Sequence, residues 1–233
     1  MEPHSQPQSW IDAIAWFSLA VAFASALIIA IDILRGYRQQ MPIMNLVYPI
    51  TALYWGPVAL WFYFRHGRRQ SAPVIEQRGE PDPDAMPWWS IVGKGISHCG
   101  AGCTLGDIAG EWLVFGLGLT IGGETLLADL PMDFAWAWTL GIGFQYFTIV
   151  PMRQVGRMKG IWAAAKADTL SIVAFQIGLF AGMAIYQKLI WDPPLPKDTA
   201  AYWMMMQLAM IIGFFTAWPV NSWLVRAGAK EKM

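Results

Sequence analysis

The chain has 233 residues, of which 56% are hydrophobic and only 14% are charged, and its formal net charge is zero. Soluble globular proteins carry about 25% charged residues, and a neutral chain offers no general attraction for nucleic acid. The composition argues against an ordinary soluble domain and a nucleic-acid-binding protein. It predicts a membrane protein whose main partner is the lipid bilayer.

The few charges are unevenly distributed along the chain. A helix needs roughly 20 apolar residues to cross a bilayer, and lipid offers the backbone no hydrogen-bond partners, so only helices are expected here. The first apolar run lacks the basic residues that begin a signal peptide, so we expect a retained helix. Five runs of at least 19 residues contain no Asp, Glu, Lys or Arg: 13–31, 39–64, 134–152, 169–187 and 199–225.

A sixth span is required between Trp88 and Gly118, although this segment contains Lys94, Asp107 and Glu111. We therefore predict an all-α, polytopic membrane protein, with a bundle of about six transmembrane helices in a single integral domain over 1–233. Residues 65–88 are expected to form a cytoplasmic loop. The predicted spans are about 11–34, 44–64, 89–118, 134–151, 161–190 and 199–225.

Six spans would bring both ends of the chain to the same side of the membrane. Lys and Arg accumulate in cytoplasmic loops, and this topology places twelve of them on one side and four on the other. Both termini are therefore expected to be cytoplasmic. Arg35 and Arg38 do not fit this prediction, because their loop would lie outside.

The third predicted span carries a polar stripe. Residues four apart share a helix face, and Cys99, Cys103, Asp107 and Glu111 follow this spacing. Ionisable groups at membrane depth are costly and are functional candidates by default. The fifth span begins with Lys166 and Asp168, and Asp168 would lie at about the same depth as Cys99. We expect a polar or transport cluster of these residues: Asp107, Glu111, Lys166 and Asp168.

A stripe of glycines lies beside the polar stripe. Gly102, Gly106 and Gly110 also recur every four residues. Small residues at this spacing allow another transmembrane helix to approach closely. The third span is therefore expected inside the bundle, with these glycines at a helix–helix contact.

His98, Cys99 and Cys103 are candidate metal ligands. Thiolates and imidazole suit Cu(I) or Zn(II), which are the cofactors we consider. Both cysteines could instead be small buried apolar residues. A disulfide is less favoured, because Cβ atoms four residues apart on a helix are about 5–6 Å from each other and a disulfide needs about 3.8 Å.

Several short segments form a recognisable set: Ser97–Asp107, Met41–Asn45, Tyr54–Pro57, Phe144–Phe147, Pro151–Arg153, Lys166–Ser171, Pro219–Asn221 and Lys230–Met233. This set resembles an uncharacterised bacterial family of membrane proteins, domain of unknown function 4396, and the resemblance covers nearly everything after Met41. It implies membership in that family and a bacterial cytoplasmic membrane, but no activity.

The leading functional hypothesis is a small transporter or metal-handling membrane protein that uses the intramembrane His, Cys and Asp side chains. One alternative is a non-catalytic accessory or assembly subunit, in a homo-oligomer or membrane complex, whose polar stripe only fixes helix packing. The other alternative is a thiol-redox membrane protein that uses Cys99 and Cys103. Catalysis is not the favoured interpretation.

Overall fold

The computed structural model describes residues 9–79, 82, 86–154, 156–191 and 193–230. This part of the chain is helical, with no strand beyond two isolated bridges. The all-α prediction is confirmed. Parts of three predicted segments lie outside the described residues: residues 1–8 of the domain, 80–81 and 83–85 of the loop, and 231–233 of the C-terminal motif.

In the described part of the chain, eight α-helices and three shorter helical segments follow one another, with these bounds: α1 Ser9–Leu34, α2 Met44–Trp55, α3 Pro57–Phe62, η1 Tyr63–Gly67, η2 Arg68–Gln70, α4 Ala72–Arg78, α5 Trp88–Leu117, α6 Thr125–Arg153, α7 Arg157–Ile185, η4 Tyr186–Ile190 and α8 Ala200–Arg226. The predicted 65–88 loop thus contains α4 as well as irregular chain.

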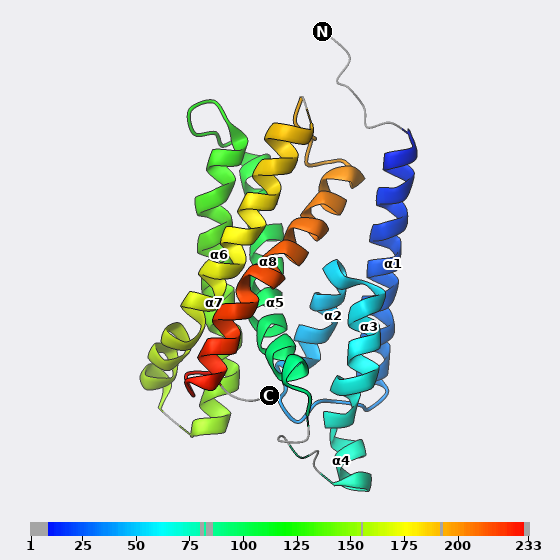
Figure 1. The fold of residues 1–233 in the computed structure, drawn as a ribbon, viewed down its shortest axis with the longest axis vertical. Helices are drawn as coiled ribbons and strands as arrows, with labels where there is room; N and C mark the ends of the chain where they lie inside the picture. The colour runs from blue at the N-terminus through cyan, green and yellow to red at the C-terminus, as the bar shows by residue number, and fades with distance from the viewer. Residues whose placement is uncertain (1–8, 80–81, 83–85, 155, 192, 231–233) are drawn as a thin grey trace.

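Four long helices, α5 to α8, form an up-and-down bundle, and α1 lies at its side with α2 and α3 between (Figure 1). Local signals set the helix ends. Pro87 precedes α5, and Gly118 ends it with a φ of 61°, a conformation that favours glycine. The Thr199 hydroxyl accepts a hydrogen bond from Tyr202 N at the start of α8.

Among the described residues, three helices are long and apolar enough to cross a membrane: 10–34, 157–190 and 200–226. These helices expose apolar side chains, most clearly on α1, where Trp16, Phe17 and Phe23 are each more than 60% exposed. A helix that shows large apolar side chains to its surroundings fits a bilayer better than water. The helices α5 and α6 have comparable lengths of 30 and 29 residues but carry more charge.

The predicted second span, 44–64, is not a single crossing helix. Gly56, with a φ of 52°, and Pro57 break this segment into α2 and α3. The chain reverses its direction between the two helices, so that they form a hairpin (Figure 1). The two ends of this hairpin are joined: Gln39 pairs with Ser71, and Ala72 N donates to Arg38 O at 2.9 Å. The hairpin therefore returns to the side from which it started.

This hairpin bears directly on the predicted topology. With five long helices and one returning hairpin, the first described residue of α1 and the last turn of α8 lie at opposite ends of the molecule (Figure 1). The bond from Ser18 Oγ to Gln207 Oε1, 2.7 Å, links the first halves of α1 and α8, as expected of helices that run in the same direction. The prediction of both termini on one side of the membrane counted this hairpin as a crossing, and it stays a prediction.

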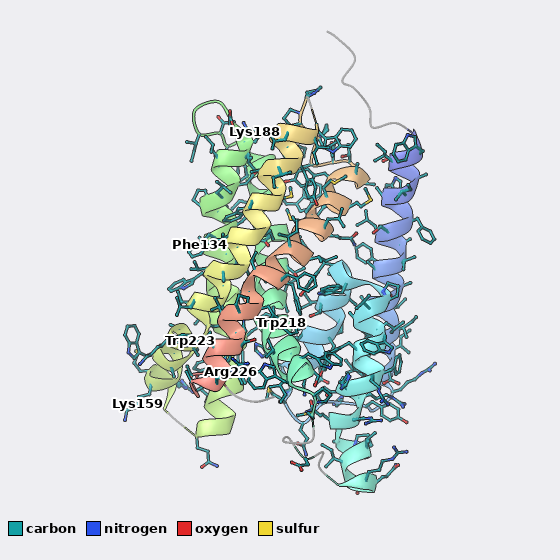
Figure 2. The ribbon with its side chains drawn as sticks, in the orientation of Figure 1. Phe134, Lys159, Lys188, Trp218, Trp223 and Arg226 are labelled. Carbon is teal, nitrogen blue, oxygen red and sulfur yellow. The ribbon has the colours of Figure 1, made fainter. Side chains whose placement is uncertain are left out.

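We call the two ends of the bundle the α4 end and the Lys188 end. Figure 2 shows Lys159 and Arg226 toward the first and Lys188 at the second. Among the described residues, Lys and Arg lie in or near segments of the α4 end, except for Lys188 and Lys197. Arg35 and Arg38 now belong with the majority, which removes the conflict in the predicted topology.

Candidate functional site

The glycine stripe of α5 faces α6. A Cβ atom added to Gly102 would lie 2.6 Å from Gly141 Cα, and one added to Gly106 would lie 2.5 Å from Ala137 Cα. At Gly110 the added atom would overlap the Asp133 carboxylate. The backbones of α5 and α6 thus approach as closely as small-residue packing allows. This contact turns the neighbouring polar face of α5 toward α7 and α8.

At the α4 end, a side chain from beyond α8 enters the bundle. Lys230 is 2% exposed, and its Nζ atom lies 2.8 Å from Asp168 Oδ1, 2.9 Å from Asn221 Oδ1, 3.0 Å from Gly95 O and 3.4 Å from Ser171 Oγ. We call this group the Lys230 cluster. Burial alone would lower the pKa of Lys230, but the charge of Asp168 and its hydrogen bond outweigh burial and raise it.

Farther along α5, the neighbouring side chains of His98 and Cys99 point to different helices. Cys99 Sγ lies 2.8 Å from Ser171 Oγ on α7, which connects it to the Lys230 cluster. His98 Nε2 lies 2.7 Å from Thr148 Oγ1 on α6, and its Nδ1 atom has no partner. Both side chains are fully buried.

The middle of the bundle holds carboxylate and amide groups. Asp107 Oδ1 accepts a hydrogen bond of 2.7 Å from Gln176 Nε2, while Asp107 Oδ2 and Gln176 Oε1 lack partners. Cys103 interacts with both side chains. Asp133 of α6 interacts electrostatically with Asp107 and Glu111, and its Oδ1 atom is also unpartnered. Native proteins leave few buried polar atoms unpaired, so these unpartnered atoms suit water, protons or a small cation as partners.

Near the Lys188 end, one lysine joins two carboxylates. Lys197, from the chain before α8, pairs with Glu111 of α5 and Asp129 of α6, and all three side chains are at most 8% exposed. Tyr202 interacts with Glu111. We call these four residues the Lys197 cluster. Asp129, Lys197 and Tyr202 line an open cavity of about 480 Å³.

Together these groups form a buried polar path from the cavity to the α4 end. The path consists of the following residues, in order: the Lys197 cluster, Asp133, Asp107, Gln176, Cys103, Cys99 and the Lys230 cluster. Each member is buried, and the path runs between α5, α6, α7 and α8.

The structure brings together some predicted site residues but not all. Asp107, Glu111 and Asp168 belong to the polar path, whereas Lys166 is exposed on α7 and does not join them. Residues two apart on a helix point to nearly opposite sides, so Lys166 and Asp168 cannot share one face. Lys230 supplies the positive charge that was expected from Lys166.

The predicted metal ligands do not converge. His98 and Cys99 are neighbours on a helix of 3.6 residues per turn, so they contact α6 and α7 respectively. Within the described chain, no three His, Cys, Asp or Glu side chains are arranged to hold a metal ion. Cys99 and Cys103 are free thiols. The geometry therefore lends the Cu(I) or Zn(II) prediction no support.

Asp129 and Asp133 were not predicted as site residues, because both fall in the connection between the predicted spans 89–118 and 134–151. Their spacing carried a signal: Asp129, Asp133, Ala137 and Gly141 recur every four residues, and all are buried on one face of α6. Nothing in the sequence placed Lys197 and Lys230 inside the bundle. Both lie outside regular helices and reach their partners only through the fold.

A family model described as "Domain of unknown function (DUF4396)" matches residues 88–230, more than half of the chain. The match begins at α5 and ends at Lys230, so it contains the bundle α5–α8 and the whole polar path. The resembling segments before Trp88 lie outside it. No curated protein and no solved structure matches the chain.

Proposed function

The chain belongs to the DUF4396 family, and from that premise we propose that it is a membrane transporter that moves protons or small cations along the polar path. The single observation that carries this proposal is the succession of buried polar side chains between the cavity and the Lys230 cluster. Ionisable groups at membrane depth are expensive and mark ion pathways and proton relays.

The charge balance of the path supports this proposal. Around its middle and its cavity end lie four carboxylates, Asp107, Glu111, Asp129 and Asp133, with Lys197 as the one cation among them in the part of the chain described. Buried like charges disfavour each other, and a buried charge without a partner is costly. Such a group must hold protons or attract cations, which are the two substrates that we propose.

The membrane arrangement is part of the proposal. At about 1.5 Å per residue, α5 and α6 are each over 40 Å long, enough to cross a hydrocarbon core of about 30 Å. We propose five crossings, α1 and α5 to α8, and one re-entrant hairpin, α2–α3. Because basic residues favour the cytoplasm, the α4 end faces it, in a bacterial cytoplasmic membrane.

A flux assay in liposomes tests the transport proposal. Purified protein is reconstituted with an internal pH indicator, a membrane potential is imposed, and acidification is followed; parallel runs use Na⁺ or K⁺ gradients. We expect Asp107→Asn to lower the flux at least tenfold, because the amide cannot release a proton or carry charge. Glu76→Gln, on the exposed surface of α4, is the matched control and should behave as the parent protein.

Flux no greater than in empty liposomes, or full flux through the Asp107→Asn variant, would refute the proposal. The second candidate is then the accessory subunit. It is favoured by a specific observation: Lys230 and Lys197 both make ion pairs that join separate helices. Such pairs can specify helix packing without moving an ion.

A further inference from the structure

The Lys230 cluster has the composition of a cation site. Four oxygen atoms from three helices surround one ammonium: Gly95 O of α5, Asp168 Oδ1 and Ser171 Oγ of α7, and Asn221 Oδ1 of α8. Carboxylate, carbonyl and hydroxyl oxygens are the ligands that hard cations prefer. Asp168 supplies the one negative charge of the cluster and the Lys230 ammonium supplies the one positive charge. The cluster is therefore neutral only while a cation occupies the position of this ammonium.

The oxygen atoms are held in place by bonds that do not involve the ammonium. Asn221 Nδ2 donates to Ala217 O at 2.9 Å and to Ser171 Oγ at 2.8 Å, which directs Asn221 Oδ1 toward Lys230. The second oxygen of Asp168, Oδ2, is buried without a partner. It lies on the side of Gly141, a residue without a side chain. The site therefore has more acceptor capacity than Lys230 uses.

The occupant is attached by a short turn rather than by a helix. Beyond Arg226 the chain reverses at Gly228, whose φ is 66°, and the backbone N atoms of Ala229 and Lys230 both donate to Leu224 O, at 3.0 and 3.2 Å. Few bonds thus hold the backbone that delivers Lys230. Its side chain can leave the cluster if this turn opens, without unfolding of α8.

We propose that Gly95 O, Asp168, Ser171 and Asn221 form a binding site for a small monovalent cation, and that Lys230 fills this site as a tethered ammonium. Free ammonium, a primary alkylammonium, Na⁺ or K⁺ is the class of ligand that the oxygen set would take. Lys230 then closes the α4 end of the polar path in the structure. That closing role rests on the transport function proposed above; the binding site itself does not.

Thermal melting of the full chain in detergent tests the site. Lys230→Ala leaves the Asp168 carboxylate buried without its partner, and we expect a Tm about 10 °C below the parent protein in choline chloride, whose cation is too large to enter. Replacing choline by ammonium, methylammonium, Na⁺ or K⁺ at constant ionic strength should restore Tm. The gain should rise with the logarithm of cation concentration, as for any ligand that binds only the folded state.

Two further variants make the result specific. Lys230→Ala combined with Asp168→Asn removes the charge that holds the cation, so its Tm should not respond to the salt. Arg226→Ala removes a basic residue of the same region that is exposed and stacks on Trp88, so its Tm should stay equal in all five salts. The parent protein should also be insensitive, because its site is occupied.

The proposal is overturned if the Tm of Lys230→Ala follows that of the parent protein in every salt, or if the double variant responds equally. Failure of Lys230→Ala to fold in any of the small cations counts against it too, because a site that accepts free cations would be rescued by one of them. The readout is Tm, so a selective rescue supports the site even where the flux assay is negative.

Discussion

Lys188 and Lys197 lie in the same connection between α7 and α8, but they have different surroundings. Lys188 pairs with Glu124, and both side chains are 45% exposed, whereas Lys197 and its two partners are at most 8% exposed. Exposed ion pairs contribute about 0–1 kcal/mol. Removing one member of a buried pair costs about 3–5 kcal/mol, because it leaves a buried charge without its partner.

We therefore expect Lys197→Ala to lower the free energy of unfolding by about 3 kcal/mol, and Lys188→Ala to lower it by at most about 1 kcal/mol. Denaturant titration in detergent measures both. Equal losses for the two variants would mean that Lys197 is hydrated and that the Lys197 cluster is open to water.

At the scale of elements, the contact between α5 and α6 depends on glycine. A methyl group on Gly106 would meet the Ala137 backbone, while one on Gly116 of the same helix would meet nothing within 4 Å. Overpacking of this kind costs about 1–3 kcal/mol. We expect Gly106→Ala to lower Tm and to separate α5 from α6. The new methyl group would meet the backbone of α6, which cannot move aside as a flexible side chain can.

Gly116→Ala is the control on the same helix. It should leave Tm unchanged or raise it slightly, because alanine is about 0.5–1 kcal/mol better than glycine within a helix. Thermal melts of the two variants side by side give the comparison. A harmless Gly106→Ala would show that α5 and α6 are farther apart than the structure indicates.

At the scale of the whole molecule, the α2–α3 hairpin decides the topology. If it returns, Arg35 and Glu76 lie on the same side of the membrane and Lys188 lies on the other. If 44–64 crossed instead, Arg35 and Lys188 would share a side. The membrane sidedness of these three exposed positions therefore distinguishes five crossings from six.

The measurement introduces one cysteine at each of these positions in turn and labels it with a membrane-impermeant maleimide. Arg35→Cys and Glu76→Cys should react in inside-out vesicles, and Lys188→Cys in right-side-out vesicles. Background should be low, because Cys99 and Cys103 are fully buried. Labelling of Arg35→Cys from the same side as Lys188→Cys would show that the hairpin crosses.

The sequence by itself determined what is local or periodic. Apolar runs of sufficient length predicted the helical class, and the four-residue spacing on α5 predicted that Asp107 and Glu111 lie on one face with the glycines beside them. The segment around Cys99 indicated the family. These conclusions need only the geometry of one helix, so they required no knowledge of its neighbours.

The tertiary structure decided everything that depends on which segments meet. Run length could not separate a crossing helix from a hairpin, because Gly56 and Pro57 break the helix without adding a charge. From the sequence, Asp129 and Asp133 fall between predicted spans. In the structure they lie on α6, where Asp129 pairs with Lys197 and Asp133 packs against α5. Lys230 enters the bundle from a turn outside α8 and meets Asp168, 62 residues away in the chain. Pairing across such separations leaves no periodic trace in the sequence, because the attraction between the two charges depends on their distance in space.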